Sequence, residues 1–281
     1  MGTQSTTWGL SRSEIAKEAR RMARPYKSFL RRNLGIIRDH DGDKAAALSG
    51  RIVWSGESLI NGDPVIVVMT NYARVSENIK TGPMVQFYIF TEKEFQAMAK
   101  AICGGCAHSK AAPGKRPACY VQWARLNSAW KAAKKNKPLS LNQACQVVKG
   151  MRIRLGAAGD PCAVPLHVWQ QLASAADGHT GYTHQWHKDW AQGYSDLLMA
   201  SVDSAAESEL ATAMGWRWFG VETPGNPLPG VRCLSEASDI ACINCMLCNG
   251  NQNMVKTGRR APNIVITAHG PGAKNVKARI P

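Results

Sequence analysis

The chain opens with apolar positions at helical spacing and a dense set of basic residues between them. From residue 11 to residue 34, Ile15, Ala19 and Met22 recur near the helical period, and Pro25 is expected to break or kink the helix. The basic residues of this segment are Arg12, Lys17, Arg20, Arg21, Arg24, Lys27, Arg31 and Arg32. Such a face is either simply solvated or an arm that lies along a nucleic-acid backbone.

The pattern then changes to that of β-strands. Residues 51–54 and 64–69 are rich in β-branched side chains, and the turn Asn61-Gly62-Asp63 between them predicts a hairpin. We expect a further strand over 85–90, followed by a short helix over 92–102.

After residue 150, apolar runs of strand length alternate with helical patterns. The expected strands are 151–155, 180–183, 197–202, 216–221 and 263–268, and the expected helices are 165–176, 188–194 and 204–214. Repeated strand–helix units predict a parallel sheet with right-handed crossovers. The pattern therefore predicts an α/β protein with a partial parallel β/α barrel, in which ligands lie at the carboxyl ends of the strands.

These patterns also predict how the chain is organised. We expect a basic helical arm, a β-rich N-terminal part, a barrel-like domain that includes a Cys-rich metal loop, and a basic tail. Their ranges are 1–50, 51–102, 103–270 with the loop at 224–250, and 271–281. The start is polar, unlike a signal peptide, and no run is apolar and long enough for a membrane span, so we expect a cytoplasmic protein without membrane contacts.

Charge is distributed unevenly along the 281 residues, whose formal net charge is +15. Between Phe95 and Gly159 there are twelve Lys and Arg but no Asp or Glu, and the segment from Ile240 to Pro281 again lacks acidic residues. Such basic stretches attract phosphate, so a nucleic acid or a nucleotide-like ligand is the expected partner. The simpler interpretation is that the charge serves solubility.

The C-terminal cysteines have the spacing of a metal site. Cys233, Cys242, Cys245 and Cys248 lie among Gly and Pro residues, and C-x-x-C spacing in a reducing compartment indicates metal ligation. Four thiolates complete a structural zinc site or hold a 4Fe-4S cluster, and the spacing leaves both open.

The other cysteine group has only three closely spaced members. Cys103, Cys106 and Cys119 leave one coordination position open, which His108 could fill in a structural zinc site. Alternatively, the group holds an iron–sulfur cluster whose fourth iron takes a ligand from outside the protein. The remaining cysteines, Cys145 and Cys162, are expected to pack as small apolar residues.

The order of these motifs is similar to that of radical S-adenosylmethionine (SAM) enzymes. More closely, the chain resembles phage and mobile-element proteins of unknown function that share a radical-SAM-like iron–sulfur barrel. The segments that carry the resemblance are Asn78-x-Lys80-Thr81-Gly82-x-Met84-x-Gln86, Cys103-Gly-Gly-Cys106 with Cys119-Tyr120, Arg154-Leu-Gly156-Ala-Ala-Gly159-Asp160-Pro161, Gly181-Tyr-Thr-His184-Gln-Trp186, Met199-Ala-Ser-Val-Asp203 and the final Cys-x2-Cys-x2-Cys. The cysteine spacing C-x2-C-x12-C differs from the C-x3-C-x2-C usual in these enzymes.

The resemblance implies roles for particular residues. The open iron would chelate the methionine part of SAM, and Gly156, Gly159 and Asp160 would form the turn that binds its amino group. His184 and His269, at strand ends, would serve acid–base catalysis or bind substrate.

Two functions remain open at the level of sequence. The first is an iron–sulfur enzyme acting on a nucleotide or nucleic acid, and the alternative is a zinc-stabilised nucleic-acid-binding protein without catalysis, whose nine tryptophans would stack bases. The enzymatic interpretation expects the three sulfurs to converge on one metal centre at the carboxyl ends of the strands, with Asp160 beside it across a cavity wide enough for a nucleoside. It also expects His108 to point away, because a fourth protein ligand would block SAM.

Overall fold

The computed structural model describes residues 11–42, 50–73, 78–109, 117–252, 258–269 and 272–276, except the side chain of Arg12. Most of the predicted basic tail, together with Lys115 and Arg116, lies outside the described residues. No helix within the described ranges is long and apolar enough to cross a membrane.

Two five-stranded sheets organise the protein, and helices accompany both, so the predicted α/β class is confirmed. The first sheet has the order β1-β2-β3-β4-β5, and the second, in which all pairs are parallel, has the order β6-β7-β8-β10-β9. The strands are β1 (Arg51–Glu57), β2 (Pro64–Thr70), β3 (Val85–Thr91), β4 (Arg152–Ala158), β5 (Gly178–Thr180), β6 (Tyr182–Thr183), β7 (Met199–Val202), β8 (Trp218–Glu222), β9 (Val231–Arg232) and β10 (Ile264–Thr267).

The first sheet combines two kinds of pairing. The predicted hairpin is confirmed, because β1 and β2 pair antiparallel around the Asn61–Asp63 turn, and β2 pairs antiparallel with β3. From β3 onward the pairs β3–β4 and β4–β5 are parallel. The two sheets adjoin at Gly181, the single residue between β5 and β6, whose added Cβ would lie 2.5 Å from a methyl group of Leu198.

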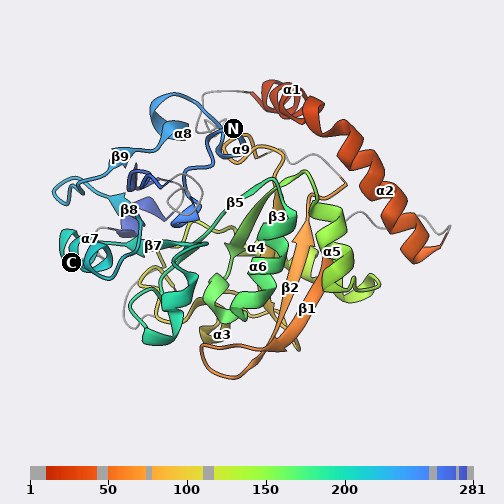
Figure 1. Ribbon diagram of the computed structural model, residues 1–281, viewed down its shortest axis with the longest axis horizontal. Coiled ribbons are helices and arrows are strands. Elements are labelled where there is room, and N and C mark those ends of the chain that lie inside the picture. Colours follow the sequence, from red (N-terminus) through yellow and green to blue (C-terminus); the bar gives the residue numbers. More distant parts are fainter. Residues whose placement is uncertain are drawn as a thin grey trace, which may run out of the picture.

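The helices lie on the outside of the sheets, and α5 and α6 pack side by side over one face of the first sheet (Figure 1). They are α1 (Arg12–Ala23), η1 (Arg24–Tyr26), α2 (Lys27–Asp41), α3 (Lys100–Cys103), α4 (Trp123–Lys135), α5 (Leu141–Val148), η2 (Pro161–Ala163), α6 (Leu166–Ala175), η3 (Asp189–Tyr194), α7 (Ala205–Ala213), α8 (Leu234–Ala237), α9 (Cys242–Cys245) and α11 (Ala273–Val276). The α-helical pattern is interrupted at Pro25, as predicted, by the 3₁₀ turn η1.

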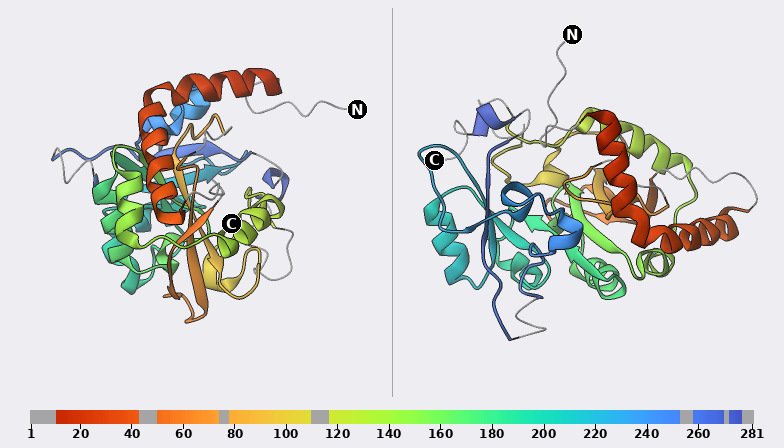
Figure 2. Two further views of the ribbon diagram at one scale, coloured as in Figure 1. Left: turned by 90° about the vertical axis from the view of Figure 1, so that its right-hand side faces the viewer. Right: turned by 90° about the horizontal axis from the view of Figure 1, so that it is seen from above.

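The N-terminal arm, α1 to α2, runs along one side of the molecule (Figure 2). On its inner side, Met22 and Tyr26 pack against a small buried cluster formed by Met84, Ala241 and Ile243. The arm is thereby in contact with the C-terminal cysteine loop, far away in sequence.

Two predicted helices differ from the structure. The helix expected over 92–102 is wrong except for α3, because Met98 has a positive φ of 60° and the Gln96 N–H is bound by the Thr91 hydroxyl. The segment expected as a helix over 188–194 is the 3₁₀ helix η3. The patterns also gave no prediction for α4 and α5.

Candidate metal and substrate site

A large cavity lies where the parallel strands end. Its empty volume is about 1640 Å³, part of it open to solvent. The residues that directly follow β4, β6, β7 and β10 all contribute to its wall: Gly159, His184, Asp203 and Ala268. The placement at carboxyl strand ends is the one expected for ligand sites in α/β proteins. Cysteines of both groups also line this cavity.

The three N-terminal cysteines, which we call the proximal group, reach the cavity from two adjoining loop segments. Cys103 ends α3, and the N–H of Cys106 donates to its carbonyl. The Cys119 N–H donates to the carbonyl of His108 at 3.1 Å, which returns the chain to the first two cysteines. Burial raises the pKa of Cys103, and the neighbouring thiols of Cys106 and Cys119 raise it further, since clustered thiolates repel one another.

The glycine-rich segment at the end of β4, from Gly156 to Asp160, is fixed against the proximal group. Gly156 and Gly159 have φ values of 59° and 78°, which favour glycine. A Cβ on Gly159 would lie 2.8 Å from the Ile89 Cβ and 2.9 Å from its carbonyl oxygen. The Asp160 N–H donates to the carbonyl of Ile102, directly before Cys103. The turn therefore needs both glycines for its own geometry.

Asp160 lies in the cavity wall but is almost saturated by donors of the protein. Its Oδ1 accepts from the Thr183 hydroxyl at 2.7 Å and from the Cys162 N–H at 3.0 Å. Its Oδ2 accepts from the His184 N–H at 2.8 Å and from Gln185 Nε2 at 3.4 Å. The carboxylate thus ties the turn after β4 to the loop after β6.

Two histidines and an aspartate gather beside Cys106. His108 Nε2 lies 2.8 Å from Asp203 Oδ1, and His184 Nε2 lies 3.7 Å from the Cys106 sulfur. Burial lowers the pKa of His184, but Cys106 and the nearby carboxylates outweigh burial and raise it to about 10. No local sequence pattern indicates that Asp203 pairs with His108. His108 lines the cavity, where its Nε2 lies against Asp203, and the expectation that it points away from a metal centre stays a prediction.

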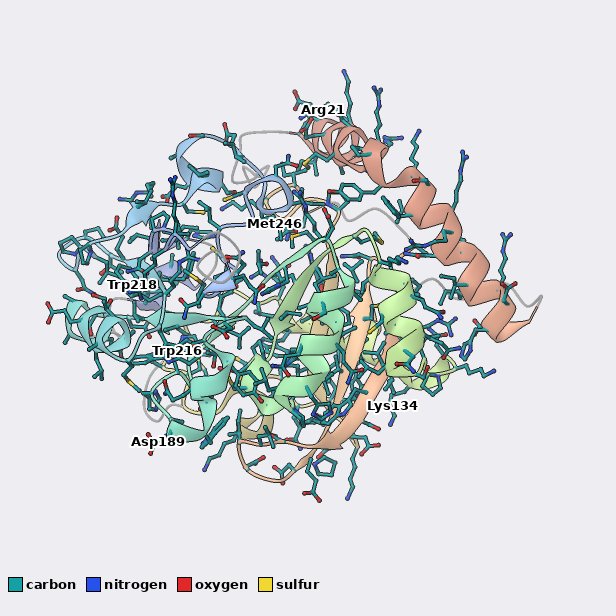
Figure 3. The ribbon with its side chains drawn as sticks, in the orientation of Figure 1. Arg21, Lys134, Asp189, Trp216, Trp218 and Met246 are labelled. Atoms are coloured by element: carbon teal, nitrogen blue, oxygen red, sulfur yellow. The ribbon has the colours of Figure 1, made fainter. Side chains whose placement is uncertain are left out.

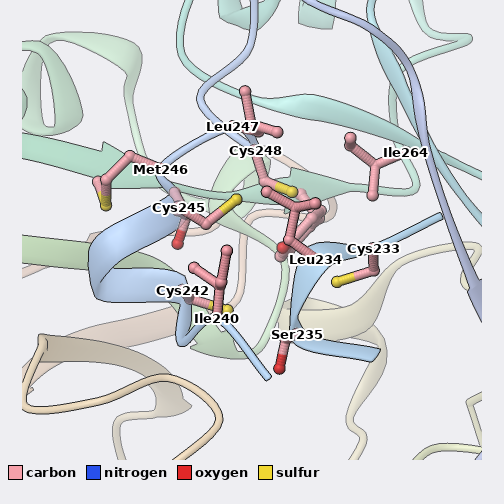
Figure 4. A pocket seen from close by; sticks show the side chains of 12 residues that line it. Cys233, Leu234, Ser235, Ile240, Cys242, Cys245, Met246, Leu247, Cys248 and Ile264 are labelled. Atoms are coloured by element: carbon pink, nitrogen blue, oxygen red, sulfur yellow. The ribbon is translucent and has the colours of Figure 1, made fainter. Parts of the chain in front are cut away.

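The four C-terminal cysteines, which we call the distal group, surround a small pocket that adjoins the large cavity. Cys233, Cys242, Cys245 and Cys248 direct their sulfurs toward a common centre, and apolar side chains such as Leu234 and Ile264 complete the wall (Figure 4). The Cys242 N–H donates to Lys80 O, the Cys233 N–H donates to Val265 O, and Cys248 O accepts from the Gly181 N–H. Burial and the neighbouring thiols raise the pKa of Cys248 to about 12.

The sulfurs of both groups are more widely spaced than a single ion requires. A tetrahedral ion with metal–sulfur bonds of about 2.3 Å holds its sulfurs about 3.8 Å apart. Among the described residues, three ligand atoms lie within 4.8 Å of one another only in the group His108, His184 and Asp203. No three cysteine sulfurs meet this spacing, although all nine cysteines are described.

Arg154, which the sequence analysis did not single out as a site residue, lies between the two cysteine groups. Its Nη2 donates to the hydroxyl of Tyr120, which follows Cys119, at 3.0 Å. Its guanidinium carbon lies 5.5 Å from the ring centre of Tyr182, which packs near Cys248. The opposite charge of Arg154 lowers the pKa of Cys242, although burial of that thiol is the larger effect and raises it.

The other predicted site residues are distributed as follows. His269 is exposed at the cavity wall, where its ring stacks on Tyr120 at 6.5 Å. Cys162 is fully buried in the main core and Cys145 packs against it, as predicted. The largest buried side chains include Trp169, Trp216 and Trp218, the latter two labelled in Figure 3. These three tryptophans are not available to stack bases.

The basic arm presents most of its charge to solvent. Its exposed cations are Lys17, Arg20, Arg21, Arg24, Lys27, Arg31 and Arg38. Arg21, which points outward in Figure 3, forms an ion pair with Glu18. Arg32 is half-buried and donates to the Val147 carbonyl, so it holds α2 in place instead of facing a partner.

Comparisons with known proteins do not help to interpret this geometry. No protein family, curated protein or solved structure matches the chain. The functional conclusion therefore depends on the residues themselves.

Proposed function

We propose that this protein is an iron–sulfur enzyme similar to radical-SAM enzymes, acting on a phosphate-bearing substrate such as a nucleotide or nucleic acid. The observation that carries the proposal is that Cys103, Cys106 and Cys119 line one cavity together with the turn from Gly156 to Asp160. Three thiolates leave one iron of a 4Fe-4S cluster open to a ligand from outside the protein.

The strand order supports a partial barrel as the scaffold. β3, β4, β5, β6, β7, β8 and β10 follow one another in parallel, if β5 and β6 are taken as one strand interrupted at Gly181. In this arrangement the proximal group follows the first parallel strand, β3, and the glycine-rich turn follows the second, β4. This order matches the one that the resemblance implies.

Within this proposal the protein groups bind and orient, while a bound cluster would supply electrons for SAM cleavage. The residues from Gly156 to Gly159 form the surface that binds SAM. Asp160 holds these residues against the end of the strand. His184 stabilises the charged Cys106 sulfur by its 3.7 Å contact. His269, exposed beside Tyr120, is placed to contact a substrate that enters from solvent.

The distal group would hold a second, closed centre. Its four thiolates leave no position for an outside ligand, and its pocket is lined by apolar side chains. Such a centre stabilises the fold, because the free energy of metal binding adds to the free energy of folding.

The test is to purify the protein anaerobically, measure iron, sulfide and the absorbance near 400 nm, and assay SAM cleavage with dithionite as the reductant. We expect a brown protein that forms 5′-deoxyadenosine. A colourless protein with stoichiometric zinc would contradict the proposal and favour a zinc-stabilised binding protein. A brown protein that does not cleave SAM would support the presence of the clusters but contradict the proposed radical chemistry.

The phosphate-bearing partner has its own test. We expect affinity for a single-stranded oligonucleotide to fall by orders of magnitude between about 50 and 200 mM salt, because cations of the arm replace counterions on the phosphates. Replacing Arg24, Lys27 and Arg31 by Ala should reduce both the affinity and its salt dependence. Replacing Lys131, Lys134 and Lys135 on α4 by Ala tests whether a second exposed basic helix contributes to this affinity. Affinity that is independent of salt would contradict this part of the proposal.

A further inference from the structure

The guanidinium of Arg154 is held rigidly but most of its donors are free. Tyr182 supports it from one side and itself packs on Phe219 at 4.7 Å between ring centres, while Tyr120 accepts one hydrogen bond. A guanidinium offers five N–H donors. In the described part of the chain, Arg154 makes no other hydrogen bond, and its buried Nε has no partner.

No carboxylate of the cavity wall balances this charge. Asp160 already accepts from four donors, and Asp203 is bound by His108. Among the described residues, Arg154 forms no salt bridge, and Lys80 adds a second cation to the same wall. A half-buried cation without a partner carries a desolvation cost, and an Arg fork matches the oxygens of a carboxylate or phosphate.

We propose that Arg154 binds an anionic group, a carboxylate or a phosphate, of the molecule that occupies the cavity between the two cysteine groups. The inference deepens the proposed function and depends on it, because that molecule is taken to be SAM or the phosphate-bearing substrate. The contact to Tyr120 places the anion next to Cys119, while Tyr182 and Cys242 lie on the distal side. Arg154 thereby holds the bound molecule between the two cysteine groups.

The alternative task for Arg154 is to offset the charge of the distal thiolates. Cys242 lines the cavity as Arg154 does. If this were its task, the loss of the charge would release metal from the distal group. If it binds a ligand, the metal stays and affinity for anionic molecules falls. The two tasks therefore differ in a measurable way.

The experiment compares wild-type protein with Arg154→Gln and Arg154→Lys, using SAM, AMP and adenosine as probes in anaerobic calorimetry. SAM carries a carboxylate, AMP a phosphate, and adenosine neither. We expect Arg154→Gln to weaken binding of at least one anionic probe by about tenfold or more, with adenosine unchanged and the iron content retained. Loss for SAM alone assigns the carboxylate, and loss for AMP alone assigns the phosphate. The affinity of Arg154→Lys for the anionic probe should lie between those of wild type and Arg154→Gln, because lysine keeps the charge but lacks the planar fork of arginine.

Tyr120→Phe is the matched control, since it removes one contact of Arg154 and leaves the guanidinium in the cavity. Equal binding of both anionic probes by wild type and Arg154→Gln would overturn the inference. So would wild-type protein that binds neither anionic probe more tightly than adenosine, or Arg154→Gln that loses iron while Arg154→Lys keeps it. Wild-type protein that contains no iron would instead refute the proposed function. Binding of the three probes to that protein would still test the role of Arg154.

Discussion

The proximal and distal cysteine groups are built from the same residue type but differ in their surroundings. The proximal sulfurs border a cavity of about 1640 Å³ that reaches solvent and includes polar groups such as His184 and Asp160. The distal sulfurs surround a much smaller pocket among mostly apolar side chains, where Cys248 is only 9% exposed, although Cys233 and Cys242 also border the large cavity. Under the proposed function, ligand number and access, more than cysteine spacing, would separate a centre that meets a substrate from one that only stabilises the fold.

The largest effect should come from breaking the distal group. Cys245→Ala removes one of four ligands from a loop that is fixed to three other segments by backbone hydrogen bonds, so we expect insoluble or metal-depleted protein. Soluble yield, iron content and thermal unfolding measure the effect. Cys145→Ala is the control, because that cysteine is half-buried in the other half of the molecule. Wild-type metal content in Cys245→Ala would refute the assignment.

Removing a proximal ligand should have a different outcome. Cys119→Ala is expected to stay folded, to fall from about eight to about four iron atoms per chain, and to lose SAM cleavage. Iron and sulfide analysis together with circular dichroism checks this prediction. If Cys119→Ala unfolds as Cys245→Ala does, the two groups are both structural and the comparison fails.

This contrast could be predicted only in part from the sequence. The hairpin, most strands after residue 150 and the spacing of the distal cysteines are local patterns. The structure bears out the hairpin and these strands, except that the strand expected over 180–183 is divided at Gly181 between the two sheets. That both groups face one cavity depends on how β4 and β6 bring distant loops together, which no local pattern encodes. The pairing of His108 with Asp203 and the position of Arg154 between Tyr120 and Tyr182 are likewise long-range contacts. The expected helix over 92–102 failed because the Thr91 hydroxyl and the positive φ of Met98 compete with helical hydrogen bonding.

The turn beside the proximal group allows a more moderate perturbation. Gly159→Ala places a methyl group 2.8 Å from the Ile89 Cβ at a φ of 78°, so we expect a loss of stability of about 1–3 kcal/mol and weaker SAM binding. Gly105→Ala is the matched control, because nothing lies within 4 Å of its added Cβ. Denaturant unfolding of both variants tests the difference, and equal stability would show that the turn tolerates displacement.

The smallest effect concerns the arm, which contacts the distal loop through Met22 and Tyr26. Chelation of the distal metal should loosen Ala241 and Ile243 and increase trypsin cleavage at the exposed Arg20 and Lys27. Peptide mapping over time measures the change. Cys119→Ala should show the protection of wild type, since the proximal group does not contact the arm's cluster in the described residues. Equal cleavage with and without distal metal would contradict this coupling.

The central claim is that one centre is open to SAM and the other is closed. Electron paramagnetic resonance of the reduced protein, recorded with and without SAM, tests this claim most directly. The account predicts two cluster signals, of which only one changes with SAM, and predicts that this signal is absent when Cys103, Cys106 and Cys119 are replaced together by Ala. Two signals that both ignore SAM, or a SAM-sensitive signal that survives the triple replacement, would contradict it.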